Sequence, residues 1–242
     1  TKEASTWRAD RTMLLRSLFI IVVTCFGNRA HALRSSLHPS ASRPLSGILF
    51  DIDGTLVNTD PIHLAVFQEL LLKEDGFKNT PIDEAFYSRN MEGRQNALII
   101  ADLFPEWSIR RREDWELHKE ARFREVAAAS MMERKMPGLD TLRSWILQNN
   151  LPRAAVTNAP RLSAEAMIAG IQYDDAFFQA LVIGDECEYA KPDPLPYLLG
   201  AKLIGVDPQE CIVFEDSPSG ARAGVAAGAY VVGILSGQDR ST

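Results

Sequence analysis

Cysteine is scarce in this sequence, which holds three cysteines among 242 residues. Three are too few for a disulfide framework, so the fold must depend on a hydrophobic core. Hydrophobic residues make up 46% of the chain and charged residues 24%. These proportions are typical of a globular protein with one large domain or two modest ones, which can build a core without disulfide staples.

Most of the chain also lacks an excess of basic residues. Residues 1–50 carry seven Lys/Arg and two Asp/Glu, which leaves nineteen Lys/Arg and thirty Asp/Glu, a net charge of −11, for the other 192 residues. Binding to nucleic acid needs a basic surface, so we expect no nucleic-acid partner. A small phosphorylated metabolite remains compatible with this charge, because a bound metal ion can balance its phosphate locally.

Acidic residues are absent from residues 11–50. A basic start, a short apolar stretch over residues 18–26 and the tripeptide Ala30-His31-Ala32 have the layout of a secretory signal. The apolar stretch is too short to span a bilayer comfortably, so we expect no stable membrane anchor after removal of the leader. The serine-rich residues 33–46 resemble an organellar transit segment, and together the two resemble the two-part leaders of algae with secondary plastids.

Residues 1–45 are therefore interpreted as a leader outside the fold. As a targeting signal, it predicts a plastid location. The alternative is a disordered tail, or untranslated sequence read through, in front of a cytoplasmic enzyme.

The most informative stretch is Gly47–Phe50, an apolar run that ends in Asp51, Asp53, Gly54 and Thr55. Side chains alternate along a strand, so Asp51 and Asp53 lean to the same side. Two such close carboxylates repel each other unless a cation lies between them or one binds a proton. This arrangement suits a divalent metal beside a reactive carboxylate. An N-cap or Asx-turn is the ordinary alternative for the pattern alone.

The remainder of the chain divides into a helical block and an alternating block. Helical patterns cover 62–73, 82–89, 96–104 and 108–132, and no strand pattern occurs over 61–137. Beyond this block, expected strands at 153–156, 181–183, 211–214 and 230–235 alternate with expected helices at 139–148, 162–169, 194–203 and 217–227. The alternation predicts an α/β fold with a Rossmann-like parallel sheet and helices on both faces. We expect a catalytic core at 46–60 and 138–242 and an all-helical cap at 61–137.

Polar residues follow the expected strands. They are Asp51 and Asp53, Thr157-Asn158, Gly184-Asp185 with Lys191 soon after, and Glu215-Asp216-Ser217. Singly, each has an ordinary explanation as a helix N-cap, a surface lysine or a solvated turn. The carboxyl ends of parallel strands meet at one edge of a sheet, where ligands bind. Four strand ends in succession therefore predict one shared site.

This constellation resembles the haloacid dehalogenase-like superfamily. The four motifs of that superfamily match Asp51-Ile52-Asp53-Gly54-Thr55, Thr157, Lys191 and Glu215-Asp216 in order, and the helical block stands where the superfamily places a C1-type cap. Residues 214–220 together with Asp60 and His63 look like the β-phosphoglucomutase-like branch. Residues 154–161 and 90–94 look like the sugar-phosphate phosphatases of plants and their relatives.

The resemblance implies a role for each motif. Asp51 would attack phosphorus and form an aspartyl-phosphate, and Asp53 would protonate the leaving oxygen and later take a proton from water. Thr157 and Lys191 would hold the transferring phosphoryl oxygens. Mg²⁺ is the expected cofactor, with the Asp51 carboxylate, the Asp53 backbone carbonyl and Asp216 as ligands and with Glu215 as a further ligand or a partner of one.

Five further residues are candidates for binding the substrate: Thr55, His63, Gly93, Arg94 and Asn158. The hydroxyl of Thr55 could also tether a carboxylate, and His63 could equally be a structural hydrogen-bonding residue on the first cap helix. The cap should close over the substrate and exclude water.

The expected function is that of a monomeric Mg²⁺-dependent phosphatase of small phosphorylated sugars or polyols. A phosphomutase of the same branch is the alternative, and a non-catalytic binding module is a third. By resemblance, mutases of the branch have a lysine directly before the glycine of the cap loop. This chain has Glu92 at that place, which favours hydrolysis. By the same resemblance, dehalogenases that cleave carbon–chlorine bonds lack an acid at the place of Asp53. The presence of Asp53 therefore favours phosphoryl transfer over dehalogenation.

Overall fold

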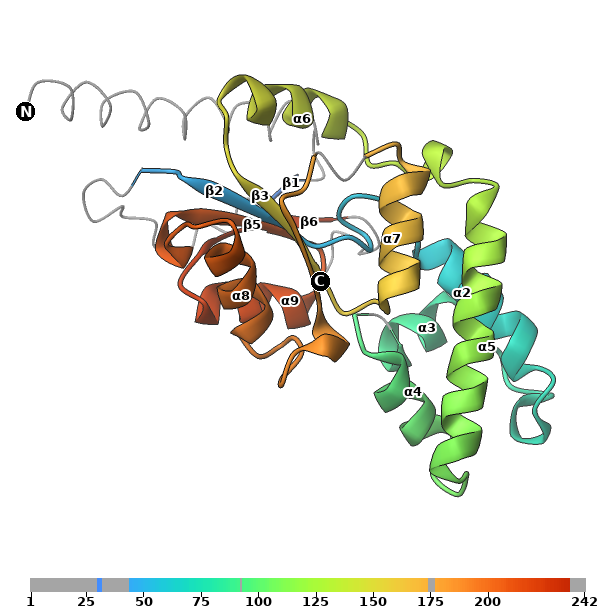
Figure 1. Ribbon diagram of the computed structural model, residues 1–242. Coiled ribbons are helices and arrows are strands. Elements are labelled where there is room, and N and C mark those ends of the chain that lie inside the picture. Colours follow the sequence, from blue (N-terminus) through green and yellow to red (C-terminus); the bar gives the residue numbers. More distant parts are fainter. Residues whose placement is uncertain (1–29, 32–43, 92, 174–176, 236–242) are drawn as a thin grey trace, which may run out of the picture.

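The computed structural model describes residues 30–31, 44–91, 93–173 and 177–235. A sheet with flanking helices forms the core, and a group of helices beside it forms the cap (Figure 1). The interpretation of the leader as a signal and transit segment falls almost wholly outside the described residues, as does Glu92.

Five parallel strands build the sheet of the core. They are β2 (Gly47–Phe50), β3 (Arg153–Thr157), β4 (Ala180–Ile183), β5 (Cys211–Glu215) and β6 (Tyr230–Ile234). Their order is β6-β5-β2-β3-β4, so β2 lies at the centre, with β3 and β5 as its parallel neighbours. The predicted α/β fold with a parallel sheet is confirmed. Asp51 directly follows β2, the central strand of these five.

One further strand was not predicted. The dipeptide β1 (Ala30–His31) pairs with the free side of β6 in the antiparallel direction. The interpretation that all of residues 1–45 lie outside the fold is thus wrong at this dipeptide and at Leu45, which is buried in the core. Two residues are too short a segment to show the alternating pattern by which a strand is predicted.

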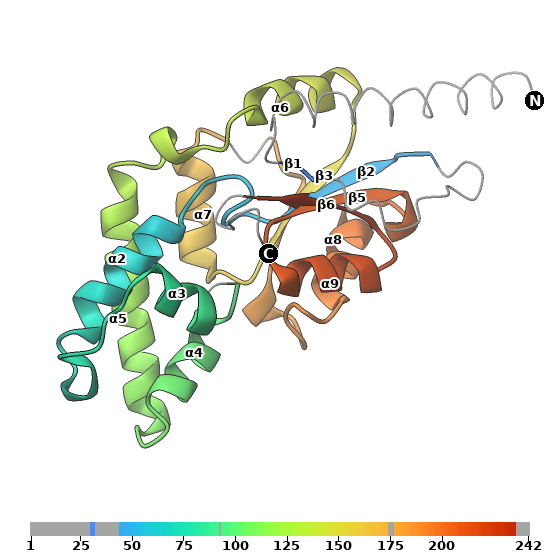
Figure 2. The same cartoon turned by 180° about the vertical axis from the view of Figure 1, so that it is seen from behind.

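Helices cover both faces of the sheet, as Figures 1 and 2 show. On one face, α6 (Leu139–Gln148) and α7 (Arg161–Gly170) share a core with Ile48 and Phe50. On the other face, α8 (Leu195–Leu203) and α9 (Pro218–Ala226) share a core with Leu49. The side chains of β2 therefore alternate between two apolar cores, which explains the uninterrupted apolar run of that strand.

The cap consists of α2 (Asp60–Leu71), α3 (Glu84–Asn90), α4 (Asn96–Leu103) and α5 (Ile109–Ala128). The long helix α5 packs against α2 and α4 within the cap and against α7 of the core. The chain enters and leaves the cap through neighbouring segments, since Val57 forms a β-bridge with Lys135. Single 3-10 turns lie at Asp75–Phe77, Met132–Arg134, Gly184–Glu186 and Pro208–Glu210.

No helix within the described part of the chain is both long and apolar enough to cross a membrane.

Candidate active site

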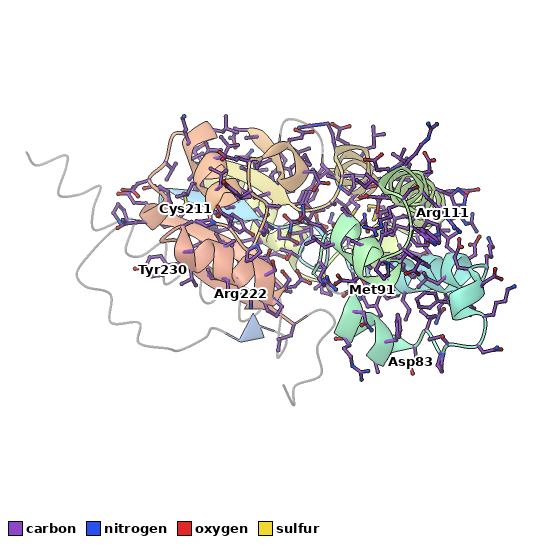
Figure 3. The ribbon with its side chains drawn as sticks, turned by 90° about the horizontal axis from the view of Figure 1, so that it is seen from below. Asp83, Met91, Arg111, Cys211, Arg222 and Tyr230 are labelled. Carbon is purple, nitrogen blue, oxygen red and sulfur yellow. The ribbon has the colours of Figure 1, made fainter. Side chains whose placement is uncertain are left out.

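A cavity lies at the carboxyl edge of the sheet and is closed on its other side by the cap. Core residues Asp51, Thr157, Lys191 and Asp216 line it together with cap residues such as Met91. Figure 3 shows Met91 between the core, where Cys211 is labelled, and the part of the cap that carries Arg111. The four strand-end motifs, far apart in the sequence, thus meet in one place.

The ammonium group of Lys191 is fixed at the centre of the site. Its Nζ donates to Asp51 Oδ1 at 2.7 Å, to Glu215 Oε1 at 2.9 Å and to the carbonyl oxygen of Val156 at 2.7 Å. Only 5% of Lys191 is exposed. Burial works to lower the pKa of Lys191, but the carboxylates of Asp51 and Glu215 outweigh it and raise that pKa. Lys191 is therefore a fixed positive charge beside Asp51.

Glu215 is held by donors on both of its oxygens. Besides Lys191, Oε1 accepts from the Tyr197 hydroxyl at 3.1 Å, and Oε2 accepts from the backbone N–H and the hydroxyl of Ser217 at 2.8 and 3.0 Å. A Cβ on Gly220 would lie 1.5 Å from Glu215 Oε1, so only glycine fits there. Of its two predicted roles, this geometry favours Glu215 as a residue that positions Lys191 over Glu215 as a metal ligand.

Negative charge concentrates between Asp51, Glu215 and Asp216, whose oxygen atoms lie within 4.8 Å of one another. Burial raises the pKa of Asp51, and Glu215 and Asp53 add to the effect while Lys191 opposes it. Burial and the neighbouring carboxylates Glu215 and Asp51 likewise raise the pKa of Asp216. Thr55 Oγ1 donates to Asp216 Oδ1 at 3.4 Å, as one reading of the sequence expects. A hard divalent cation with oxygen ligands fits this crowding of carboxylates.

Asp53 has different surroundings from Asp51. Its Oδ1 accepts from the Thr59 hydroxyl at 2.7 Å and lies 3.2 Å from His63 Nε2. Its side chain is 29% exposed, whereas that of Asp51 is 9% exposed. One aspartate is thus buried against a lysine, and the other faces the cavity with a hydroxyl and an imidazole on one oxygen. Such unequal surroundings allow two carboxylates to play different roles.

Cap residues contact Asp53 through a chain of polar side chains that begins at His63. The other members of this chain, Lys119, Glu120 and Asn96, were not predicted from the sequence. His63 stacks on Phe123, and its Nδ1 lies 3.1 Å from the Nζ of Lys119 on α5. Lys119 Nζ also donates to Glu120 Oε1 at 2.6 Å and to Asn96 Oδ1 at 3.1 Å. A signal did exist, because Lys119 lies four residues from both Trp115 and Phe123 and so falls on the buried face of α5.

Glu120 joins the cap to the core. Its Oε1 accepts from Asn96 Nδ2 at 2.8 Å, and its Oε2 accepts from the hydroxyl of Ser163 on α7. Burial works against its charge, but the ammonium group of Lys119 and the donated hydrogen bonds dominate and lower the pKa of Glu120 to about 2. Glu120 is therefore ionised at neutral pH although it is only 4% exposed.

This lowered pKa predicts a pH dependence of stability. Because the pKa falls from 4.5 to about 2 on folding, Glu120 stabilises the fold above about pH 4.5 and loses this contribution as the pH falls towards 2. Relative to Glu120→Gln, the unaltered protein should lose about 2 kcal/mol of unfolding free energy between about pH 6 and pH 3. Urea unfolding of both proteins at each pH measures the difference, and a difference that does not change with pH would contradict the assignment.

Two of the predicted substrate-binding residues lie in the wall of the cavity but are engaged elsewhere. Asn158 Nδ2 donates to the carbonyl oxygen of Lys191, and its Oδ1 accepts from the Lys191 N–H, both at 3.2 Å. Arg94 donates to the Asn90 carbonyl oxygen at 2.8 Å and pairs with Asp102 within the cap. Asn158 thus holds the lysine loop in place, and its predicted direct contact with phosphate stays a prediction.

Thr157 and Gly93 both lie against the cavity, as predicted. Thr157 is 1% exposed, and its Oγ1 accepts from the backbone N–H of Ala159 at 3.0 Å, which leaves the hydroxyl proton to be donated. Gly93 has φ +67°, and a Cβ there would lie 2.9 Å from the Cβ of Ser217. The cap loop therefore touches the core beside the Glu215-Asp216 motif.

This contact predicts the effect of a methyl group at the seam between cap and core. Gly93→Ala should lower kcat/KM about tenfold, since a left-handed residue with a Cβ costs roughly 1–2 kcal/mol and the clash moves the loop off Ser217. Gly76→Ala is the matched control, because Gly76 is also in the cap and a Cβ there meets nothing within 4 Å. Equal activity of the two variants would show that the loop does not need this close approach.

A parallel α/β sheet whose acidic edge is closed by a helical cap is the architecture of a capped hydrolase. The chain belongs to the haloacid dehalogenase-like hydrolase family, whose model matches residues 45–228. This assignment and the fold agree with the resemblance drawn from the motifs.

Similar proteins indicate the branch of that family to which this chain is related. The fructose-1-phosphate phosphatase YqaB of Escherichia coli K12 is 30% identical over 200 residues, which cover 78% of this chain and 96% of that protein. Hexitol phosphatase A of the same organism is 33% identical over 201 residues, 78% of this chain and 82% of that protein. A β-phosphoglucomutase structure from Clostridium difficile has a TM-score of 0.69 at 20% identity and covers 77% of this chain and 83% of its own.

Proposed function

We propose that this protein is a Mg²⁺-dependent phosphatase that hydrolyses small phosphorylated sugars or polyols. The observation that carries the proposal is the pairing of buried Asp51 with Lys191 Nζ at 2.7 Å, with Asp53 facing the same cavity. A nucleophilic carboxylate, a fixed cation and a second, more accessible carboxylate are the groups that phosphoryl transfer through an enzyme-bound intermediate requires.

The side chains divide the reaction between them. Asp51 attacks phosphorus and forms an aspartyl-phosphate, while the leaving oxygen takes its proton from Asp53, which then accepts one from the attacking water. Lys191 and the Thr157 hydroxyl offset the charge on the transferring phosphoryl oxygens. Asp51, Asp216 and the Asp53 carbonyl would hold Mg²⁺, which supplies charge screening between the carboxylates and the phosphate when bound.

Hydrolysis is favoured over phosphoryl transfer between positions of a sugar. The relatives at 30% and 33% identity are both named as phosphatases, one of fructose 1-phosphate and one of hexitol phosphates. The mutase neighbour is 20% identical and supports the fold alone. The phosphomutase alternative would need interconversion of hexose 1- and 6-phosphates, which an assay can separate from phosphate release.

The test is a phosphate-release screen of the purified protein with and without Mg²⁺. Fructose 1-phosphate, sorbitol 6-phosphate, phosphoglycolate and glucose 1- and 6-phosphates form the panel. We expect release from at least one sugar or polyol phosphate and its loss with EDTA, restored by Mg²⁺. Interconversion of glucose 1- and 6-phosphates without phosphate release would establish the mutase instead, and metal-independent release would contradict the role of Mg²⁺.

A further inference from the structure

The cations that the cap places around the cavity are already paired with carboxylates of the cap itself. Lys119 is bonded to Glu120 at 2.6 Å, and Arg94 pairs with Asp102. The third lysine or arginine in the described wall of the cavity is Lys191, which lies at the core end against Asp51. The cap end of the cavity therefore offers no positive charge that lacks a neighbouring negative one among the described residues.

The Lys119–Glu120 pair is more constrained than a surface ion pair. Both side chains are almost fully buried, with exposures of 1% and 6%. Glu120 also receives hydrogen bonds from Asn96 and from Ser163, so its carboxylate is fixed on both oxygens. A buried charge held in this way resists displacement, because removing its partners would leave it uncompensated.

We propose that Glu120 makes the enzyme select substrates that carry a single phosphate group. By neutralising Lys119, Glu120 denies a second phosphate its counter-ion at the cap end and presents a carboxylate to it instead. The inference rests on the proposed phosphatase function and deepens it by defining the substrate class as monophosphates with an uncharged remainder.

The chemistry of the two ends of the cavity explains this selection. At the core end, Lys191 and the Thr157 hydroxyl would contact the transferring phosphate, and Asp51 and Asp216 would hold the metal ion that balances its charge. At the cap end, a second phosphate would carry up to two negative charges towards Glu120, whose side chain is only 6% exposed, so the repulsion between these like charges is weakly screened. Hydroxyl groups of a sugar or polyol carry no such penalty and can donate to Glu120.

The experiment compares one sugar with one and two phosphates. For the unaltered protein with Mg²⁺, kcat/KM for fructose 1-phosphate should exceed that for fructose 1,6-bisphosphate. Glu120→Gln keeps the shape of the side chain and an acceptor oxygen for Lys119, and its NH₂ group can donate to the Ser163 hydroxyl in place of the second acceptor oxygen. The variant leaves the charge of Lys119 uncompensated. The ratio of bisphosphate to monophosphate kcat/KM should rise about tenfold in this variant, the gain expected from one new charge-assisted hydrogen bond.

Two further variants make the test independent of how well Glu120→Gln folds. Lys119→Met removes the cation and leaves the carboxylate, so the same ratio should fall below that of the unaltered protein, whatever happens to the absolute rate. Glu125→Gln is the matched control on α5, because Glu125 is 71% exposed and pairs with Arg122 on the surface. This control should leave the ratio unchanged.

The outcomes distinguish a failure of this inference from a failure of the proposed phosphatase function. Opposite shifts of the ratio in Glu120→Gln and Lys119→Met support the selection by charge. A ratio that stays within about twofold of the unaltered protein in both variants overturns it, as does a native preference for the bisphosphate. If the unaltered protein releases phosphate from no monophosphate at all, the proposed function itself fails.

Discussion

The Asp51→Asn variant should release phosphate at least about 10⁴-fold more slowly than the unaltered protein, yet be similarly stable. An amide nitrogen and oxygen cannot replace the attacking carboxylate, so the aspartyl-phosphate cannot form. Burial raises the pKa of Asp51, which means that its ionised form is costly in the fold. Lys191 keeps Glu215 and the Val156 carbonyl as acceptors after the change. We therefore expect the unfolding free energy to change by no more than about 1 kcal/mol.

Phosphate release under saturating substrate and urea unfolding measure the two halves of this prediction. Asp75→Asn is the control, because Asp75 is an aspartate of the cap whose side chain is 96% exposed. It should match the unaltered protein in both measurements. A rate within about tenfold of the unaltered enzyme for Asp51→Asn would remove Asp51 as the nucleophile.

The core of this fold is predictable from the sequence because its strands have a simple cause. The apolar run Gly47–Phe50 is buried on both faces, and short runs of the same kind form β3 and β5 on either side of it. Each run ends in polar residues, and the parallel arrangement brings those ends together. Asp51, Thr157, Lys191 and Asp216 can therefore be placed at one edge without knowledge of any distance.

The contribution of the cap cannot be reached in the same way. Lys119, Glu120 and Ser163 meet because α5 packs against both α2 and α7, and the angle between helices is not written in a local pattern. The helix that carries Lys119 and Glu120 is strongly charged throughout, so the spacing that puts Lys119 on the same face as Trp115 and Phe123 does not by itself distinguish this pair from the other charges of the helix. Their burial distinguishes them, and burial here depends on which face of α5 meets the core.

Asn158 illustrates why the partners of a side chain are harder to predict than its place in the fold. Its place after a strand predicts contact with the substrate, and in the structure it also bonds to both backbone polar groups of Lys191. Asparagine carries a donor and an acceptor and can match an N–H and a C=O of another segment equally well. Which of these partners it finds depends on the loop between β4 and α8, whose path the sequence does not reveal.

Lys191→Met is expected to cost both activity and stability, in contrast to Asp51→Asn. Methionine keeps much of the length and apolar volume of lysine but removes the cation that lies 2.7 Å from Asp51 and 2.9 Å from Glu215. Two buried carboxylates would then lose their counter-charge, and breaking a buried ion pair on one side costs about 3 kcal/mol or more. The rate should fall by about 10³-fold, because the transferring phosphoryl group loses a preorganised positive charge.

Urea unfolding and phosphate release of Lys191→Met, measured beside the exposed α8 control Lys202→Met, provide the comparison. The decisive feature is the sign of the charge removed. Removing a negative charge from the cluster with Asp51→Asn should leave stability nearly unchanged, whereas removing the positive charge with Lys191→Met should lower it, because acidic groups outnumber basic ones around this lysine. Equal effects of the two variants on stability would contradict the view that Lys191 offsets an excess of buried carboxylates.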